Sequence, residues 1–315
     1  MKKLTLYTLS MLLAGILLNS CKKDVPSIKT TKTDTTTAKV STIAYGNYQY
    51  ITVDKSGNIY ALRINSPADT IYKFTQAGVR SVFFVPPVTM NDDTAVTHVM
   101  NGLTTDSLGN IYTVVYNGIA NNPNVFKIAS DGTSTVAYSN INFTGELQSG
   151  KIAFDGPGNF YYTGNGTLYK ISTGGATSQV AASTVFTPDV YGNIYYATNQ
   201  TEVQKISPSG TVTTVVPQSK ITGDIANMGS DVFGNVYISS FIDDSNSGIS
   251  ASQVNTATIT KLKTNDSLKT VISTKQGYAD GPISTAKIML PLSLVTDAAG
   301  NLYFLDSGDI RKITF

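Results

Sequence analysis

The sequence predicts an all-β protein, a six-bladed β-propeller closed by an N-terminal strand. A phrase of the form Asp-x-x-Gly-Asn-apolar-Tyr occurs six times, beginning at Asp54, Asp106, Asp155, Asp189, Asp231 and Asp297. The steps between copies run from 34 to 66 residues, which is close to the length of a propeller blade with loops of variable size. The last copy is followed by too few residues for a complete unit, and an unassigned β-prone stretch stands at residues 39–45.

Each unit contains enough β-prone sequence for four short strands, which we call a to d. A large apolar residue stands three positions before each Asp, an apolar-Tyr pair follows the Asn, and a Lys with an aliphatic or aromatic neighbour comes later. The repeated phrase is therefore expected at the tight turn between strands a and b. The predicted blades are 46–86, 98–140, 147–182, 183–217, 225–274, and 290–315 together with 39–45.

Turn chemistry accounts for the repeated phrase. The Asp side chain accepts backbone hydrogen bonds within the turn, Gly supplies a positive φ, and Asn tolerates the left-handed region. The copies lack the further carboxylates and the terminal Glu of a calcium-binding EF-hand loop, so we interpret them as turns. We expect the six Tyr to pack between blades. No cofactor is expected, with Ca²⁺ as the one open possibility.

These residues resemble the NHL-repeat family of β-propellers. The resemblance runs from about Lys39 to Phe315 and is closest after Gly277, where Tyr-Ala-Asp-Gly, Asp-Ala-Ala-Gly-Asn-Leu-Tyr and Ile-Arg-Lys-Ile match the family pattern. It implies the propeller fold and says little about activity, because propellers carry many functions.

The N-terminus predicts export and lipid anchoring. Residues 1–20 combine two lysines with a short apolar core and end in Leu-Asn-Ser before Cys21, the only cysteine. This ending resembles the signal of bacterial lipoproteins, so we interpret Cys21 as the lipidated, palmitate-bearing first residue of the mature chain. Residues 21–38 are rich in Thr, Lys and Ser and are expected to form a flexible tether. By the same resemblance, we expect the protein on the outer membrane, on its periplasmic side or at the cell surface.

Ring closure is expected to use the N-terminal strand. The chain ends directly after the third strand of the sixth unit, so that unit lacks strand d. Pairing of residues 39–45 beside 310–315 would supply it and leave no open sheet edge.

Charge narrows the possible partners. The formal charge of +2 falls to 0 once Lys2 and Lys3 leave with the signal peptide. A neutral chain lacks the basic excess of a nucleic-acid binder, so no nucleic-acid partner is expected. The expected partners are the membrane, through the lipid, and a protein or glycan bound by a monomer.

The long connections indicate a working face. In a four-stranded blade the b-c and d-a connections share one face, and the four longest stretches, 86–97, 140–149, 241–256 and 275–290, all belong to that set. Variable loops on a rigid scaffold often carry binding residues. Polar candidates there are Asp92, Asp93, His98, Glu146, Asp243, Asp244, Tyr278 and Asp280. Tyr116, Phe143 and Phe241 are candidate aromatic platforms for a glycan.

The register of strand a identifies candidate channel residues. Four positions before each repeated Asp stand Tyr50, Gly102, Lys151, Val185, Asn227 and Ser293, which alternate with the packed apolar positions. Tyr50, Lys151 and Asn227 would form the polar lining, which contains no carboxylate.

Two functions from different classes remain. The first is a non-catalytic binding or scaffold propeller. A purely structural envelope protein is a variant of this function, and it would have a stable protein partner and no small ligand. The alternative is a metal-dependent lactonase, because propellers of the gluconolactonase type hold a divalent metal in the channel with acidic and amide groups. A candidate ligand set for that metal is Glu146, Asp224 and Asn227. One histidine is too few for a multi-histidine zinc site.

Overall fold

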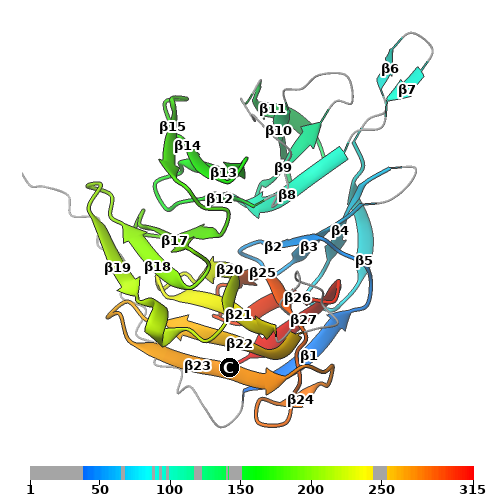
Figure 1. The fold of residues 1–315 in the computed structure, drawn as a ribbon. Helices are drawn as coiled ribbons and strands as arrows, with labels where there is room; N and C mark the ends of the chain where they lie inside the picture. The colour runs from blue at the N-terminus through cyan, green and yellow to red at the C-terminus, as the bar shows by residue number, and fades with distance from the viewer. Residues whose placement is uncertain are drawn as a thin grey trace, which may run out of the picture. The chain divides into compact units, whose positions relative to one another are not determined.

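The computed structural model describes residues 38–64, 68–86, 89–91, 94–96, 99–116, 123–139, 141, 151–243 and 254–315. The predicted signal peptide, Cys21 and nearly all of the tether therefore lie outside the described residues. Within the described ranges the chain is built almost wholly from β-strands, and Figure 1 shows the blades following one another along the chain.

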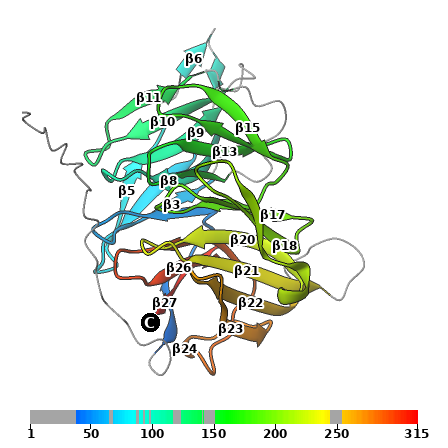
Figure 2. The same cartoon turned by 90° about the vertical axis from the view of Figure 1, so that its left-hand side faces the viewer.

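Five blades are formed by strands that are consecutive in sequence, as the labels β20 to β23 show for one of them in Figure 2. Their bounds are as follows: blade 1, β2 Tyr50–Val53, β3 Ile59–Arg63, β4 Thr70–Phe74 and β5 Arg80–Phe84; blade 2, β8 Val99–Thr105, β9 Ile111–Tyr116, β10 Asn124–Ile128 and β11 Ser134–Tyr138; blade 3, β12 Ile152–Phe154, β13 Phe160–Gly164, β14 Thr167–Ile171 and β15 Thr177–Ala181; blade 4, β16 Phe186–Pro188, β17 Ile194–Thr198, β18 Glu202–Ile206 and β19 Val212–Val216; blade 5, β20 Asp224–Ser230, β21 Val236–Asp243, β22 Val254–Leu262 and β23 Leu268–Lys275.

The sixth blade joins the two ends of the chain. It contains β25 Pro291–Thr296, β26 Leu302–Asp306, β27 Asp309–Thr314 and the N-terminal β1 Lys39–Ala44. β1 runs antiparallel to β27, with Lys39 opposite Thr314 and Ala44 opposite Ile310. The predicted closure by an N-terminal strand is confirmed, and the fold is a six-bladed β-propeller. A short β24, Gly281–Pro282, extends this sheet beyond β1.

Two small elements lie in connections. The hairpin of β6 Thr89–Asn91 and β7 Thr94–Val96 occupies the connection from blade 1 to blade 2, and a 3-10 turn, η1 Gln218–Lys220, lies between blades 4 and 5. In the part of the chain that the structure describes, no helix is long and apolar enough to cross a membrane.

The repeated phrase forms the expected a-b turn and does more than the sequence predicts. In every copy the Asp accepts hydrogen bonds from the main chain and the side chain of the Asn four residues later. In five copies the Tyr two residues after that Asn also donates its hydroxyl to the Asp; these are Tyr60, Tyr112, Tyr161, Tyr195 and Tyr303. Each Asp side chain therefore fixes the turn and the start of strand b together.

The recurrent Lys completes the same cluster from strand c. In all six blades it lies directly across the strand pair from the Tyr. In four of these pairs the ammonium lies 5.0–5.8 Å from the centre of the Tyr ring, within cation-π range; the lysines are Lys73, Lys170, Lys261 and Lys312.

The apolar core is divided among the blade interfaces. The innermost strands are adjacent around the ring in the order β2, β8, β12, β16, β20 and β25, and β25 returns to β2. Six clusters of buried side chains each join one blade to the next; one, for example, joins Tyr60 and Leu62 of blade 1 to Met100 and Ile111 of blade 2. All six repeated Tyr are members, as predicted, so neighbour-on-neighbour packing stabilises the ring.

Candidate functional site

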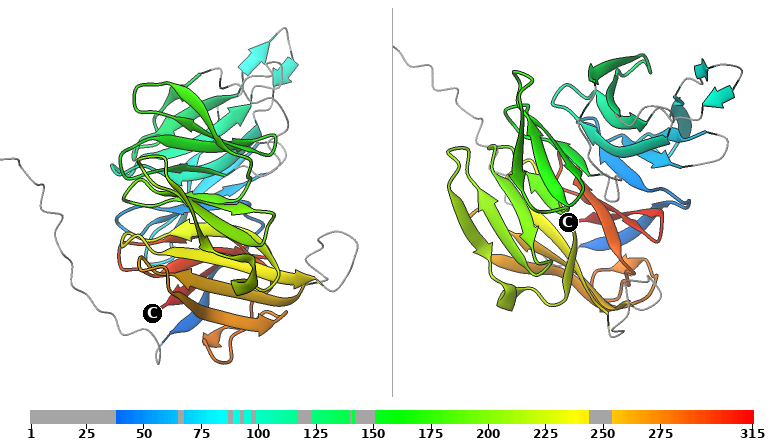
Figure 3. Two further views of the ribbon diagram at one scale, coloured as in Figure 1. Left: turned by 60° about the vertical axis from the view of Figure 1, so that its left-hand side comes forward. Right: turned by 45° about the horizontal axis from the view of Figure 1, so that its top comes forward.

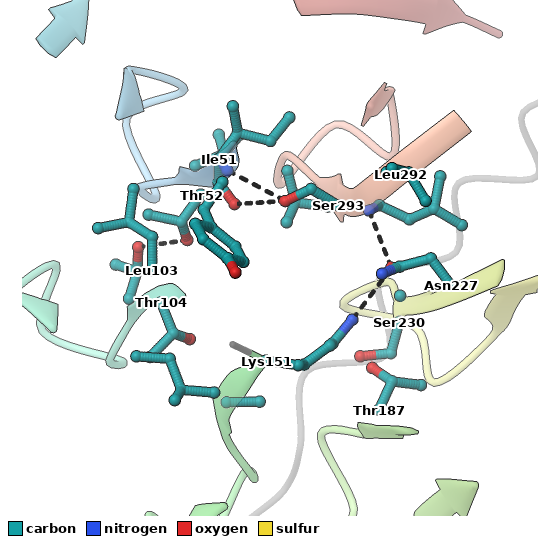
Figure 4. A pocket seen from close by; sticks show the side chains of 18 of the residues that line it. Ile51, Thr52, Leu103, Thr104, Lys151, Thr187, Asn227, Ser230, Leu292 and Ser293 are labelled. Atoms are coloured by element: carbon teal, nitrogen blue, oxygen red, sulfur yellow. Dashed lines mark hydrogen bonds between the residues drawn. The ribbon is translucent and has the colours of Figure 1, made fainter. Parts of the chain in front are cut away.

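The innermost strands of all six blades surround a central channel with a volume of about 490 Å³. Its walls are largely hydroxyl, amide and aliphatic groups, and Figure 4 shows the polar side chains that converge on it. The polar members are Gln49, Tyr50, Thr52, Thr104, Thr105, Lys151, Thr184, Thr187, Asn227, Ser230, Ser293 and Thr296. None of the described residues that line the channel is a carboxylate or a histidine.

Register shifts in two inner strands orient the side chains of Asn227 and Ser293 toward the channel. The pairing of β20 with β21 shifts between Ile225 and Asn227, and the pairing of β25 with β26 shifts between Leu292 and Val295. A β-bulge of this kind redirects a side chain without ending the strand. Ser293 sits in the second bulge with φ at +52°, and its hydroxyl accepts a hydrogen bond from the Ile51 amide at 3.0 Å.

Lys151 spans the channel from blade 3 to blade 5, skipping blade 4. Its Nζ donates to Asn227 Oδ1 at 3.2 Å and to the carbonyl oxygen of Met228. Asn227 Oδ1 also accepts from the Leu294 amide at 3.2 Å. With no carboxylate in the lining to stabilise the ammonium, burial lowers the pKa of Lys151 to about 7. Near neutral pH the channel therefore contains an amine that gains or loses its proton.

Other polar groups link successive blades around the channel. The Thr52 and Thr105 hydroxyls lie 2.7 Å apart, Ser230 donates to the Pro188 carbonyl at 2.7 Å, and Thr296 donates to the Ser230 carbonyl at 3.0 Å. Burial raises the pKa of the Tyr50 hydroxyl to about 12, so this group remains a neutral donor and acceptor. Apart from Lys151, the lining is a set of neutral polar groups.

The structure brings together the three channel candidates that the sequence identified. Tyr50, Lys151 and Asn227 all line the cavity, together with Val185 and Ser293 at the same register position. They lie near the start of strand a, so they are closest to the face of the d-a and b-c connections. Gly102, at the equivalent position in blade 2, is not among the lining residues.

Tyr278 and Asp280 lie in a different cluster, at the outer edge of blade 6. Asp280 accepts from the amide and the hydroxyl of Thr42 in β1, and it forms an ion pair with Arg311 at 2.9 Å. The Arg311 guanidinium lies 4.3 Å from the centre of the Tyr278 ring, and the Tyr278 hydroxyl donates to Asp309. These contacts hold the closing strand in place, so both residues have a structural role here.

Of the remaining loop candidates, the structure describes only Asp243. Asp92, Asp93, His98, Phe143, Glu146 and Asp244 lie outside the described residues, and Asp243 is the last residue of β21. Of the speculative metal ligands, Asp224 does not line the channel, and Asn227 Oδ1 already accepts hydrogen bonds from Lys151 and Leu294. Within the described ranges there is no group of three or more His, Cys, Asp or Glu that could hold a metal ion. The described donors therefore do not fit a divalent cation, which needs several anionic or carbonyl oxygens.

Two aromatic candidates are less accessible than a glycan platform requires. Phe241 is buried in the cluster between blades 5 and 6, so the expectation that it is exposed is wrong. Tyr116 ends β9, packs partly against the cluster between blades 2 and 3, and has its pKa raised by burial.

Sequence reasoning missed a second cavity of about 310 Å³ beside the channel mouth. It shares Gln49, Tyr50 and Leu292 with the channel and extends over Leu290 and Leu305 to the β26–β27 turn at Ser307 and Gly308. It also missed the channel hydroxyls of Thr52, Thr104 and Thr187. Alternation along strand a could have identified these three, because they stand two residues before the repeated Asp, on the same side as Tyr50 and Lys151.

Comparison with known proteins supports the fold. No family model and no curated protein matches the chain. Among solved structures, a protein of unknown function from Bacteroides thetaiotaomicron aligns with a TM-score of 0.61 and 16% identity over 88% of this chain and 76% of its own. A gluconolactonase from Xanthomonas campestris gives 0.57 and 10% over 88% and 89%, and a streptogramin B lyase gives 0.53 and 13% over 88% and 97%. At these identities the likeness establishes the propeller fold alone.

Proposed function

We propose that the protein is a non-catalytic binding propeller of the bacterial envelope, anchored to the outer membrane by a lipid on Cys21, that recognises a glycan at the channel mouth. The observation that carries this proposal is the lining of the channel, in which hydroxyl and amide groups and one lysine surround about 490 Å³. We further propose that the six units are NHL-type repeats, on the strength of the repeated Asp-x-x-Gly-Asn-apolar-Tyr phrase.

The chemistry of the lining suits a ligand rich in hydroxyl groups. The cavity lies within the range of about 300–1,000 Å³ that is typical of small-ligand sites. Asn227, Ser293 and the threonines offer donors and acceptors in neutral form, and Tyr50 adds an aromatic ring with a neutral hydroxyl. A polyhydroxylated ligand can satisfy such groups without bringing a charge into the channel.

Lys151 adds a preference among glycans. Its ammonium is held by one amide oxygen and one carbonyl oxygen, with no carboxylate partner in the described lining. A sugar carboxylate would supply the missing countercharge and favour the protonated amine. Acidic sugars should therefore bind better than their neutral counterparts, and binding should tighten as the pH falls through about 7.

The test is a glycan array followed by calorimetry with the best neutral and acidic ligands. Lys151→Met retains most of the side chain's length and removes the amine, so it should abolish the acidic preference. Lys220→Met is the matched control, because Lys220 is an exposed lysine of η1 at the connection between blades 4 and 5. Equal loss in both variants, or no glycan binding at any pH, would contradict the proposal.

The lipid anchor requires its own test. Cells that express the full chain would be labelled with an alkyne analogue of palmitate and separated into membrane and soluble fractions. We expect labelling and membrane retention of the wild-type protein, and loss of both in Cys21→Ala.

A lactone hydrolase is the second candidate. Structural neighbours include gluconolactonases and a lyase, and an amine that is partly neutral near pH 7 can accept a proton from water. The described donors do not fit a metal, so such an activity would depend on Lys151 and survive EDTA. Turnover of a lactone panel that is lost in Lys151→Met and unaffected by EDTA would favour this candidate over the binding function.

A further inference from the structure

We propose that the face carrying the a-b turns lies against the phospholipid surface, with an apolar crescent of turn tips as the contact and the channel mouth directed away from the membrane. This inference rests on the proposed lipid anchor at Cys21. It goes beyond that anchor because it assigns one face of the propeller to the bilayer.

The first step is the point at which the tether reaches the propeller. β1 lies antiparallel to β27, and its first residue, Lys39, pairs with Thr314 at the end of strand c. Strand c ends on the face of the a-b and c-d turns, so the chain enters the ring there and β1 runs toward the long-connection face. The left view of Figure 3 shows the C-terminus on one face and the β6–β7 hairpin on the other.

The second step is the composition of the turn tips. Each repeated phrase places two residues between Asp and Gly, and in blades 2 to 6 none of these ten residues is charged. They include several exposed apolar side chains, among them Leu108 at 83% and Tyr191 at 55% exposure. Tips of tight turns are normally occupied by Gly, Pro, Asn, Asp and Ser, so the exposed Leu, Val and Tyr side chains are unusual at these a-b turns.

The third step is that the tips form one continuous surface. A Cβ atom on Gly192 would lie 3.2 Å from the side chain of Pro157, and a Cβ atom on Gly234 would lie directly against the Tyr191 ring. A Cβ atom on Gly300 would lie 3.6 Å from the Phe233 ring. The tips of blades 3, 4 and 5 therefore each rest on the glycine of the next blade. We call this surface the apolar crescent: Pro157, Val190, Tyr191, Val232, Phe233, Ala298 and Ala299.

The tether permits this contact. The 18 residues from 21 to 38 can extend at most about 65 Å, at roughly 3.3–3.6 Å per residue. The anchor therefore confines the turn face to the neighbourhood of the bilayer. Tyr and Val at the tips suit the interfacial region, where an aromatic ring can retain a hydrated hydroxyl.

The test uses the absence of tryptophan from the chain, which makes one introduced Trp an unambiguous probe. Mature protein would be coupled through Cys21 to a maleimide lipid in phosphatidylethanolamine–phosphatidylglycerol vesicles that contain brominated acyl chains. Chemical coupling makes the measurement independent of lipidation in cells, which the palmitate experiment decides separately. The probe is Tyr191→Trp, and the matched control is Tyr45→Trp, 75% exposed just after β1 on the opposite face.

We expect the Tyr191→Trp emission to shift to the blue and to be quenched by the brominated lipid, while Tyr45→Trp emission is unchanged. Replacing Val190 and Val232 by Ser in the Tyr191→Trp protein should reduce the quenching. Replacing Val85 and Val136 by Ser should not, because these similarly exposed valines lie just past the end of β5 and in the middle of β11, away from the turn tips. Equal quenching of both probes, quenching of Tyr45→Trp alone, or no quenching of either would overturn the proposal.

Discussion

The Tyr161 hydroxyl illustrates how one hydrogen-bond donor contributes to the stability of a blade. It donates at 3.0 Å to Asp155, which is buried and also accepts the amide and side chain of Asn159. Loss of one donor to a buried carboxylate costs about 1–3 kcal/mol. We therefore expect Tyr161→Phe to lower the free energy of unfolding by that amount in urea titrations.

Tyr191→Phe is the control for that measurement. Tyr191 is an exposed turn-tip residue, and its phenol makes none of the contacts that Tyr161 makes with Asp155. Its substitution should leave stability nearly unchanged. Equal losses in the two variants would show that the Tyr–Asp hydrogen bond contributes little.

Lys151 predicts a dependence of stability on pH. Its pKa is about 7 in the folded protein and about 10.4 in an unfolded chain, so between these values the unfolded state binds more protons. Stability should therefore rise with pH above 7, by at most about 1.4 kcal/mol per pH unit from this one group. Urea unfolding from pH 7 to pH 9 measures it. Lys151→Met should flatten the slope, and an unchanged slope would mean that the amine is not buried as described.

At the residue scale, alternation along strand a was enough to identify Tyr50, Lys151 and Asn227 as channel residues. The bridge from Lys151 to Asn227 was not predictable, because it joins blades 3 and 5 and depends on a bulge in β20. The hydrogen bond from the Tyr to the Asp, present in five of the six copies, was also missed, although the constant spacing of six residues was visible. Packing and hydrogen bonding are compatible roles for one Tyr side chain.

Among the elements, β1 is the strand that closes the ring. It covers β27 and carries Val40, which is buried with Phe304 and Ile313 in the cluster between blades 5 and 6. Removing it would expose these side chains and one whole strand edge.

The matching prediction compares two truncations of the mature protein. Deleting residues 22–45 should lower the melting temperature by several degrees, at about 2–4 °C for each kcal/mol lost in a domain of this size. Deleting residues 22–37, which leaves β1 intact, should not change it. Similar melting of the two proteins would mean that β1 contributes little to the ring.

The sixth blade was predictable because its missing strand was a gap in an otherwise regular pattern. The cluster around Arg311 was not, although Tyr278, Asp280 and Arg311 were all visible as parts of the family resemblance. Arg311 is fully buried and bonds to Asp306 at 2.6 Å and Asp280 at 2.9 Å. These partners become neighbours only when the segment before β25 folds back over β1, and sequence spacing does not encode such a contact.

For the whole molecule, metal dependence separates the candidate functions. The described channel residues offer no carboxylate, so melting of the mature protein should be the same in calcium, zinc and EDTA. A ligand bound only by the folded state would raise the melting temperature by mass action. A clear increase with either metal would restore the metal-dependent lactonase alternative, with ligands outside the described residues.

The overall architecture was predictable from the sequence because the same turn phrase occurs six times, once in each blade. The ligand did not follow, because the residues that distinguish one propeller from another occur once each. Lys151, Asn227 and Ser293 stand at equivalent positions in three blades and are three different residue types, so no repeated pattern marks them.

The direction in which the chain enters β1 has a mechanical consequence. If the proposed lipid anchor lies on one face and the proposed ligand is held on the other, tension between them would act along the axis of β1. A strand pulled along its axis must break its pairings with β27 together, whereas a strand peeled sideways loses them one at a time. Near Lys39 the load is also shared with β24, which pairs with the other edge of β1. The chain thus enters β1 in the orientation that would best resist such a pull on the proposed anchor.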